Sequence, residues 1–376
     1  MKKILLSVLI CTTIFTTQQI QAQTGKLDHE CTSWIVFSDL TKNNTNILHK
    51  NRDSKNRQIA VYLSPADSPR KWVGQGNPGS PTNMAINTSG LAGVMNSGEK
   101  CINHSTDSTK KGTPAIMRVI MESCDTAAQA VAKLKEIMQA GDYWHRKSGS
   151  IFFFCDLNEG YVCEMTAKDI SVQRYDKGYT VRANIWLNPD MQRFARNNIK
   201  AYLNSAGRMF TVISRFNKAL DTTGKLTVQD SIATARNHKM PPESPDKRSV
   251  CSNSTNSSAT FEIDKEYPAV LSTAYFNTGH PLHTICMPIP ICAEKLHPAM
   301  SDLSWSKAAF ARFDKFGKQD IPTDWVKFEK DFMAKYIAAK AEARKLLNSG
   351  KRAEAVKLIN DTAETIWKDA VKLMDL

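Results

Sequence analysis

The chain has 376 residues, of which 41% are hydrophobic and 23% are charged. This composition indicates a globular protein and excludes a disordered one, and the length allows one large domain or two ordinary ones. The formal net charge is +13, but the basic residues are scattered, with no dense run and no interleaved aromatic residues. We therefore expect no nucleic-acid partner.

The first 22 residues have the parts of a secretory signal peptide. Lys2 and Lys3 form a positive segment, an apolar stretch runs from Ile4, and Ala22 is the small residue that signal peptidase prefers. The stretch is too short to remain as a membrane span. No later segment is long and apolar enough to cross a membrane, so we expect no stable membrane insertion. The signal peptide predicts an exported protein, periplasmic or extracellular.

The elements that follow alternate in groups rather than one by one. The patterns predict strands at 33–38, 46–51 and 58–63, a Gly- and Pro-rich loop at 72–82, and helices at 115–122 and 126–139. They then predict strands at 150–156, 161–165, 170–174 and 179–185, helices at 192–220 and 227–238, and strands at 259–263 and 270–276. A helical tail from Trp325 is split into a hairpin at Ser349-Gly350. Grouped strands and helices favour an α+β layered domain.

The stretch HECTSWIVFSD places Cys31 just before the first strand. If the hairpin turn is centred near Asn43, Cys31 faces approximately residue 55, and Lys50, Asn51 and Asp53 return to its neighbourhood. A cysteine beside a cation and a carboxylate is a candidate activated thiol. Alternatively, Cys31 is half of a disulfide or a packed thiol, as is common in exported proteins. Eight cysteines follow the signal, and their pairing cannot be derived from the sequence.

A base for this thiol is not evident among the histidines. His29 lies two residues before Cys31, and His49 could point to either face of its strand. Cleavage between Glu30 and Cys31 would solve the problem, because the new α-amino group has a pKa of about 7.7 to 8.0 and could take the thiol proton.

The pattern CTS, followed about twenty residues later by HKNRD, resembles the cysteine-type N-terminal-nucleophile (Ntn) hydrolases that act on linear amides. This group includes penicillin V acylase, choloylglycine hydrolase and isopenicillin-N acyltransferase. Four further segments resemble the family in the same order: NTSGLAGVMNSG, SIFFFCDLNEGYVCEMT, TVRANIW and NSAGRMF. The closing strands, STAYFNTGHPLHTICMPIP, are also similar, so the resemblance covers about residues 31 to 290.

The resemblance implies a four-layer αββα sandwich and self-cleavage before Cys31. The helical tail then forms a C-terminal extension of this sandwich. The expected organisation is a signal peptide (1–22), a propeptide (23–30), a catalytic domain (31–300) and a helical extension (301–376). The resemblance further implies no cofactor and no metal, a small-molecule amide as substrate, and leaves a homo-oligomer open.

The resemblance also implies the site residues. Cys31 would be the nucleophile and, through its amine, the base, while Asp53 would orient that amine. The Asn184 side chain and the Asn96 backbone N–H would form the oxyanion hole, and Arg208 would balance charge. Bile-salt hydrolases have an arginine where this chain has a lysine, Lys50, which keeps the charge but loses the planar fork, so the substrate stays open.

The sequence also allows other functions and sites. A dipeptidase of the same superfamily would share the N-terminal cysteine, and an exported binding protein could keep the fold without activity. A group of histidines and cysteines at 280–297 has the residue types of a zinc site, but prolines interrupt it and it lacks a paired Cys-x-x-Cys. The sequence contains no Gly-x-Ser-x-Gly nucleophile elbow.

Overall fold

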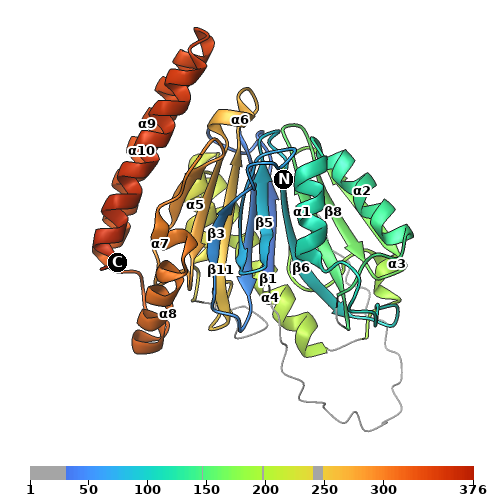
Figure 1. Cartoon of the computed structure of the whole chain (residues 1–376). Helices are drawn as coiled ribbons and strands as arrows, with labels where there is room; N and C mark the ends of the chain where they lie inside the picture. Colours follow the sequence, from blue (N-terminus) through green and yellow to red (C-terminus); the bar gives the residue numbers. More distant parts are fainter. Residues whose placement is uncertain (1–30, 146, 197–198, 240–248) are drawn as a thin grey trace, which may run out of the picture.

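Two antiparallel β-sheets lie face to face at the centre of the molecule, between helices (Figure 1). This computed structural model describes residues 31–145, 147–196, 199–239 and 249–376. The predicted signal peptide and propeptide fall outside the described residues.

The first sheet carries the start of the described chain. Its six strands are ordered β10-β1-β2-β11-β12-β13. Their bounds are β1 Cys31–Val36, β2 Asn46–Asp53, β10 Tyr179–Arg182, β11 Thr255–Ile263, β12 Thr273–Thr278 and β13 Met287–Pro290. β1 and β2 are central and almost wholly buried, so polar side chains on them must find partners inside the protein.

The second sheet has seven strands in sequence order, β3 to β9. Their bounds are β3 Ala60–Leu63, β4 Trp72–Asn77, β5 Ser80–Asn87, β6 Ala92–Lys100, β7 Ser148–Cys155, β8 Gly160–Met165 and β9 Ile170–Tyr175. β6 contacts β1 and β2 across the interface between the sheets. The inner face of the first sheet, which includes Cys31, is therefore covered by the second.

Helices cover the outer face of each sheet. α1 (Thr113–Ser123) and α2 (Ala127–Gln139) pack on the second sheet, and α4 (Ile199–Thr223) and α5 (Val228–Ala235) pack on the first. The result is the expected αββα sandwich (Figure 1). Short helices α3 (Pro189–Gln192), α6 (Pro268–Leu271) and α7 (Pro298–Ser301) and the longer α8 (Ser304–Phe316) lie in the connections.

The predicted loop at 72–82 is wrong, because these residues form the β4–β5 hairpin. Its glycines serve close backbone packing rather than disorder. A Cβ on Gly76 would lie 1.9 Å from the Ser80 carbonyl oxygen, and Gly79 has a φ of +76° at the turn. Both positions require glycine for that reason. The density of Gly and Pro therefore concealed a strand pair.

Several helix boundaries differ from the prediction by a few residues. The helix expected at 192–220 is α4, which begins at Ile199 after the separate short helix α3. The helix expected at 126–139 begins at Ala127, because Thr126 is its N-cap and forms a reciprocal capping box with the side chain of Gln129.

The C-terminal helices form the predicted hairpin, in which α9 (Thr323–Asn348) and α10 (Arg352–Leu373) are joined at Gly350, whose φ is +76°. α10 contacts β13, where the Trp367 indole donates to the Pro288 carbonyl at 2.8 Å. A buried ion pair at 2.8 Å joins Lys340 of α9 to Glu262 of β11. The extension thus shares its core with the sheet it covers.

Within the described ranges, no helix is long and apolar enough to cross a membrane. The eight cysteines that follow the predicted signal are all described, and each is a free thiol.

We expect Trp367→Ala to lower the free energy of unfolding by about 3 to 5 kcal/mol, the usual cost of truncating a buried aromatic side chain. Urea denaturation should still show one transition, because the hairpin shares the core of the sandwich. Lys368→Ala, at the exposed neighbouring position, should change stability by less than about 0.5 kcal/mol. A separate early transition for the tail would contradict the shared core.

Candidate active site

Cys31 begins β1 and is 4% exposed. In the β1–β2 pair it lies opposite Arg52, and Ser33 lies opposite Lys50. The predicted partner near residue 55 is therefore wrong by three positions. The connection between the strands is not a tight turn at Asn43, since Lys42 donates from its backbone to Leu226 in another segment. The second strand, β2, nevertheless lies beside Cys31, as expected.

Both main-chain polar atoms of Cys31 are held by side chains far away in sequence. Its nitrogen donates to Asn184 Oδ1 at 2.7 Å. Its carbonyl oxygen accepts from Arg208 Nη1 at 2.5 Å, and the same nitrogen donates to the Thr32 hydroxyl at 2.8 Å. Arg208 Nη2 donates to Asn184 Oδ1 at 2.9 Å, and Nε donates to Asn204 at 3.0 Å. The guanidinium therefore fixes Cys31 and Asn184 together.

The two asparagines singled out by the sequence serve different contacts. Asn184 donates one amide hydrogen to the Ser97 carbonyl at 2.7 Å. The amide has two hydrogens, so a second donor remains on the same nitrogen. The Asn96 side chain accepts from the Ser33 hydroxyl at 2.8 Å and donates to the Ala183 carbonyl at 3.0 Å. It thereby links β6 to β1 and to the residue before Asn184.

Lys50 is fully buried on the same face of the first sheet as Cys31. Its ammonium donates to the Met95 carbonyl, and its charge interacts with the Cys31 thiol. Burial lowers the pKa of Lys50, and its interaction with Cys31 opposes that shift.

Asp53 lies at the end of β2, on the opposite face from Lys50. Its two oxygens accept from the Thr255 hydroxyl at 2.6 Å and the Ser252 hydroxyl at 2.9 Å. Burial raises its pKa to about 6, against the opposing effects of Arg208, the two hydroxyls and Lys50. The Cys31 nitrogen bonds to Asn184 and not to Asp53, so Asp53 acts on the cluster through its charge.

The structure thus gathers all six sequence-predicted residues around the start of β1. Three are joined directly by hydrogen bonds, namely Cys31, Asn184 and Arg208, and the charge of Lys50 interacts with the thiol. Asp53 lies within electrostatic reach of Arg208, and Asn96 acts through Ser33 and Ala183.

Sequence reasoning assigned no role to Arg52, although it stands within the HKNRD segment and directly opposite Cys31. It also gave none to the hydroxyls of Ser252 and Thr255 that bind Asp53. The hairpin register would have identified Arg52 had the turn been placed correctly. No sequence pattern indicated the two hydroxyls, because they lie about 200 residues from Asp53 along the chain.

His49 does not serve the thiol. Its ring stacks on Trp34 with centroids 3.9 Å apart, and its nitrogens bond to Thr260 and Asn51. Burial lowers its pKa to about 3, so it stays neutral at physiological pH. The part of the chain that the structure describes contains no histidine hydrogen-bonded to Cys31.

The His/Cys group at 280–297 has other contacts. His280 Nε2 bonds to the Ser252 carbonyl and His283 Nε2 to the Gly317 carbonyl. Among the described residues, no group of three or more His, Cys, Asp or Glu side chains is placed to hold a metal ion.

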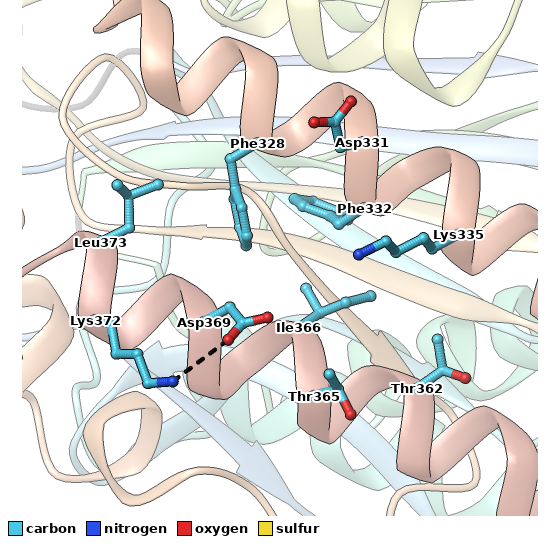
Figure 2. Close-up of a pocket in the computed structure, with 10 residues that line it drawn as sticks. All are labelled: Phe328, Asp331, Phe332, Lys335, Thr362, Thr365, Ile366, Asp369, Lys372 and Leu373. Atoms are coloured by element: carbon cyan, nitrogen blue, oxygen red, sulfur yellow. Dashed lines mark ion pairs between the residues drawn. The ribbon is translucent and has the colours of Figure 1, made fainter.

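Two cavities lie away from Cys31. One of about 640 Å³ lies between α9 and α10, with an apolar floor that includes Phe328, Phe332 and Ile366 (Figure 2). The other, of about 720 Å³, lies between α5 and α9 and is lined in part by Ile232 and Met333. Neither is lined by a residue of the Cys31 cluster.

The two face-to-face sheets between helices, and the cluster at the start of β1, are the arrangement that the resemblance to Ntn hydrolases of linear amides implies. A family model described as acyl-coenzyme A:6-aminopenicillanic acid acyl-transferase matches residues 40–242. The match covers more than half of the chain, which therefore belongs to this family of acyl-transferring and amide-cleaving enzymes. It includes the Lys50–Asp53 segment and both asparagines, and it begins after Cys31.

Two solved structures are similar in outline. A mutant of the conjugated bile acid hydrolase from Clostridium perfringens is 12% identical, with a TM-score of 0.46, covering 70% of this chain and 93% of its own. Penicillin V acylase from Agrobacterium tumefaciens is 13% identical, with a TM-score of 0.47, covering 69% of this chain and 86% of its own. No curated protein matches the sequence.

Asp53 predicts a pH dependence of stability. Its pKa in the folded protein, about 6, exceeds its usual value of 3.8, so its contribution favours folding at low pH and is lost as the pH rises through about 6. Asp53→Asn removes this dependence. Relative to wild type, its free energy of unfolding should improve between about pH 4 and pH 8, by up to about 3 kcal/mol.

Urea titrations at the two pH values measure this difference. The control, Asp176→Asn, changes an exposed carboxylate and should show no comparable improvement. If Asp53→Asn is penalised equally or more at the higher pH, Asp53 does not have the raised pKa.

Proposed function

We propose that this protein is an exported hydrolase that cleaves a linear amide bond of an N-acyl or peptide-like substrate through an acyl-enzyme on Cys31. Removal of residues 23–30 would make Cys31 the N-terminal residue. One observation carries this proposal: the Cys31 nitrogen bonds to Asn184 while its carbonyl bonds to Arg208. Both main-chain atoms of one cysteine are thus fixed, as a nucleophile that is also its own base requires.

The reaction would begin with transfer of the thiol proton to the free α-amine of Cys31. The thiolate attacks the amide carbonyl, forming a C–S bond and a tetrahedral oxyanion. Collapse breaks the C–N bond, and the ammonium returns its proton to the leaving amine. A water molecule then hydrolyses the thioester. Another amine could take the acyl group instead, in keeping with the family's description as acyl-transferases.

The neighbouring residues support this chemistry. The second amide hydrogen of Asn184, and the backbone N–H of Asn96, would stabilise the oxyanion. Lys50 would balance the negative charge of the thiolate during attack. Asp53 would offset the positive charges of Arg208 and of the protonated α-amine without touching the latter.

Hydrolysis of a dipeptide is less well supported. The free amino group of such a substrate would need an acidic partner near the nucleophile. The carboxylate that acts on this cluster is Asp53, and its oxygens are already engaged by Thr255 and Ser252. The cations Lys50 and Arg52 lie on the Cys31 face instead.

The mature protein should begin at Cys31, and replacing Cys31 by alanine should abolish amide hydrolysis. Intact-mass measurement and N-terminal sequencing test the first point. A panel of penicillin V, conjugated bile acids, N-acyl amines and dipeptides tests the second. Cys292→Ala, which removes another thiol, should keep both properties. A mature wild-type chain that stably begins at Gln23, or full activity in the Cys31 variant, would sink the proposal and favour a binding protein.

Asn184→Ala should lower kcat by about 10²- to 10³-fold, the usual effect of losing one oxyanion donor. Steady-state kinetics on the best substrate of the panel measures it. Asn217→Ala, whose side chain accepts from Tyr179 at an exposed position, is the control and should retain activity. An Asn184 variant with unchanged kcat would remove this residue from the oxyanion hole.

A further inference from the structure

Arg52 occupies the position directly across the strand pair from Cys31. Residues opposite each other in antiparallel strands have Cα atoms about 4.5 to 5.5 Å apart, and their side chains project from the same face. The charge of Arg52 interacts with the Cys31 thiol. A guanidinium is therefore built into the immediate surroundings of the reacting sulfur.

The hydrogen bonds of this guanidinium are incomplete. Nη2 donates to Asn77 Oδ1 at 2.7 Å. Nη1 is buried and has no hydrogen-bond partner within the described ranges. A buried donor without a partner is costly and needs an explanation, and a ligand group that accepts from it is one.

The surrounding charges have the same sign. Lys50 lies next to Arg52 along the same face, and its ammonium donates to a backbone carbonyl. Across the described part of the chain, neither cation forms a salt bridge with an acidic side chain, in contrast to Arg182, which lies 3.5 Å from Glu164. The Cys31 face therefore has excess positive charge.

We propose that Arg52 is a specificity-determining residue that binds a carboxylate of the substrate close to the scissile amide. A planar guanidinium with a free donor matches a carboxylate better than a neutral group does. Arg52 is placed to hold this anion while Cys31 reacts, and Lys50 adds to the attraction. This inference deepens the proposed function and rests on it for the identity of the reaction.

The carboxylate has two chemical sources. It can belong to the leaving amine, as in an N-acyl amino acid, or to the acyl part, as in the half-amide of a dicarboxylic acid. Both place a negative charge within a few bonds of the amide. N-acetylglycine and succinamic acid represent the two arrangements, and their neutral counterparts are N-acetylglycinamide and succinamide.

Alkylation of Cys31 tests the inference without knowledge of the natural substrate. Iodoacetate and iodoacetamide both react by displacement of iodide from carbon by the thiolate, and they differ in charge. Peptide mass spectrometry of the mature protein gives the two rates at Cys31. Their ratio cancels any change in the thiolate fraction, so it reports the attraction of the site for a carboxylate.

We expect wild-type Cys31 to favour iodoacetate over iodoacetamide more strongly than free cysteine does. In Arg52→Gln the ratio should fall about tenfold, the size expected for losing one hydrogen bond to a charged group. Arg52→Lys should restore part of it, and Arg174→Gln, an exposed charge control, should match wild type. An Arg52→Gln ratio equal to that of wild type would overturn the inference.

A second measurement needs no variant. N-acetylglycine or succinamic acid should slow the alkylation of wild-type Cys31 by iodoacetamide, and their neutral counterparts should not. The more protective acid identifies the side of the amide that carries the charge. Equal protection by the acids and their neutral counterparts would overturn the inference.

The two proposals fail in different ways. Charge-selective labelling with no hydrolysis in the substrate panel would reject the proposed function and leave the anion site. Hydrolysis that depends on Cys31, with no charge selectivity, would reject the anion site alone. If neither reagent labels Cys31, the site does not admit ligands and both are rejected.

Discussion

The buried guanidinium of Arg208 is the contact on which the site depends. It comes from α4, on the outer face of the first sheet, and it binds the Cys31 carbonyl, the Thr32 hydroxyl and the Asn184 side chain. Arg208 is 1% exposed, and a buried charge is costly unless hydrogen bonds and an opposite charge offset it. The three acceptors supply hydrogen bonds, and Asp53 supplies negative charge. The start of β1 is thus fixed by the need to satisfy this cation.

This constraint explains why the functional groups lie on both faces of one strand pair. Side chains alternate along β2, so Lys50 and Arg52 face the second sheet with Cys31, while Asp53 faces α4 with Arg208. The thiol side carries the cations Lys50 and Arg52, and the outer side carries the Asp53 carboxylate together with the Arg208 guanidinium. The main chain of Cys31 runs between them, with its nitrogen turned to Asn184. A one-residue shift in the pairing would exchange the two faces.

Much of this arrangement could be predicted from the sequence. Local patterns predicted part of it, and the family resemblance predicted the contacts between distant residues. The αββα class followed from grouped strands and helices together with the family resemblance, and the C-terminal hairpin followed from its helical composition and Ser349-Gly350. The antiparallel pairing of the first two strands is enough to predict that Lys50 and Asp53 lie near Cys31. Asn184 and Arg208 were found through the resemblance, because no local pattern connects residues so far apart.

The errors have physical causes. The turn near Asn43 was placed on polar composition, but Lys42 is engaged by Leu226 in a distant segment, which moved the register and concealed Arg52. The Gly- and Pro-rich composition of 72–82 favours a loop, whereas Gly76 allows two backbones to approach closely within a hairpin. In both cases a tertiary contact decided a structure that local propensity left undetermined.

The central claim is that Cys31 carries the acyl group during turnover. Brief reaction with the best substrate of the panel, followed by an acid quench, preserves a thioester for mass spectrometry of the digested protein. The account predicts that the acyl mass appears on the peptide that begins with Cys31, and that it disappears in the Cys31→Ala protein. An acyl group on another residue, or turnover in the Cys31→Ala protein, would contradict it.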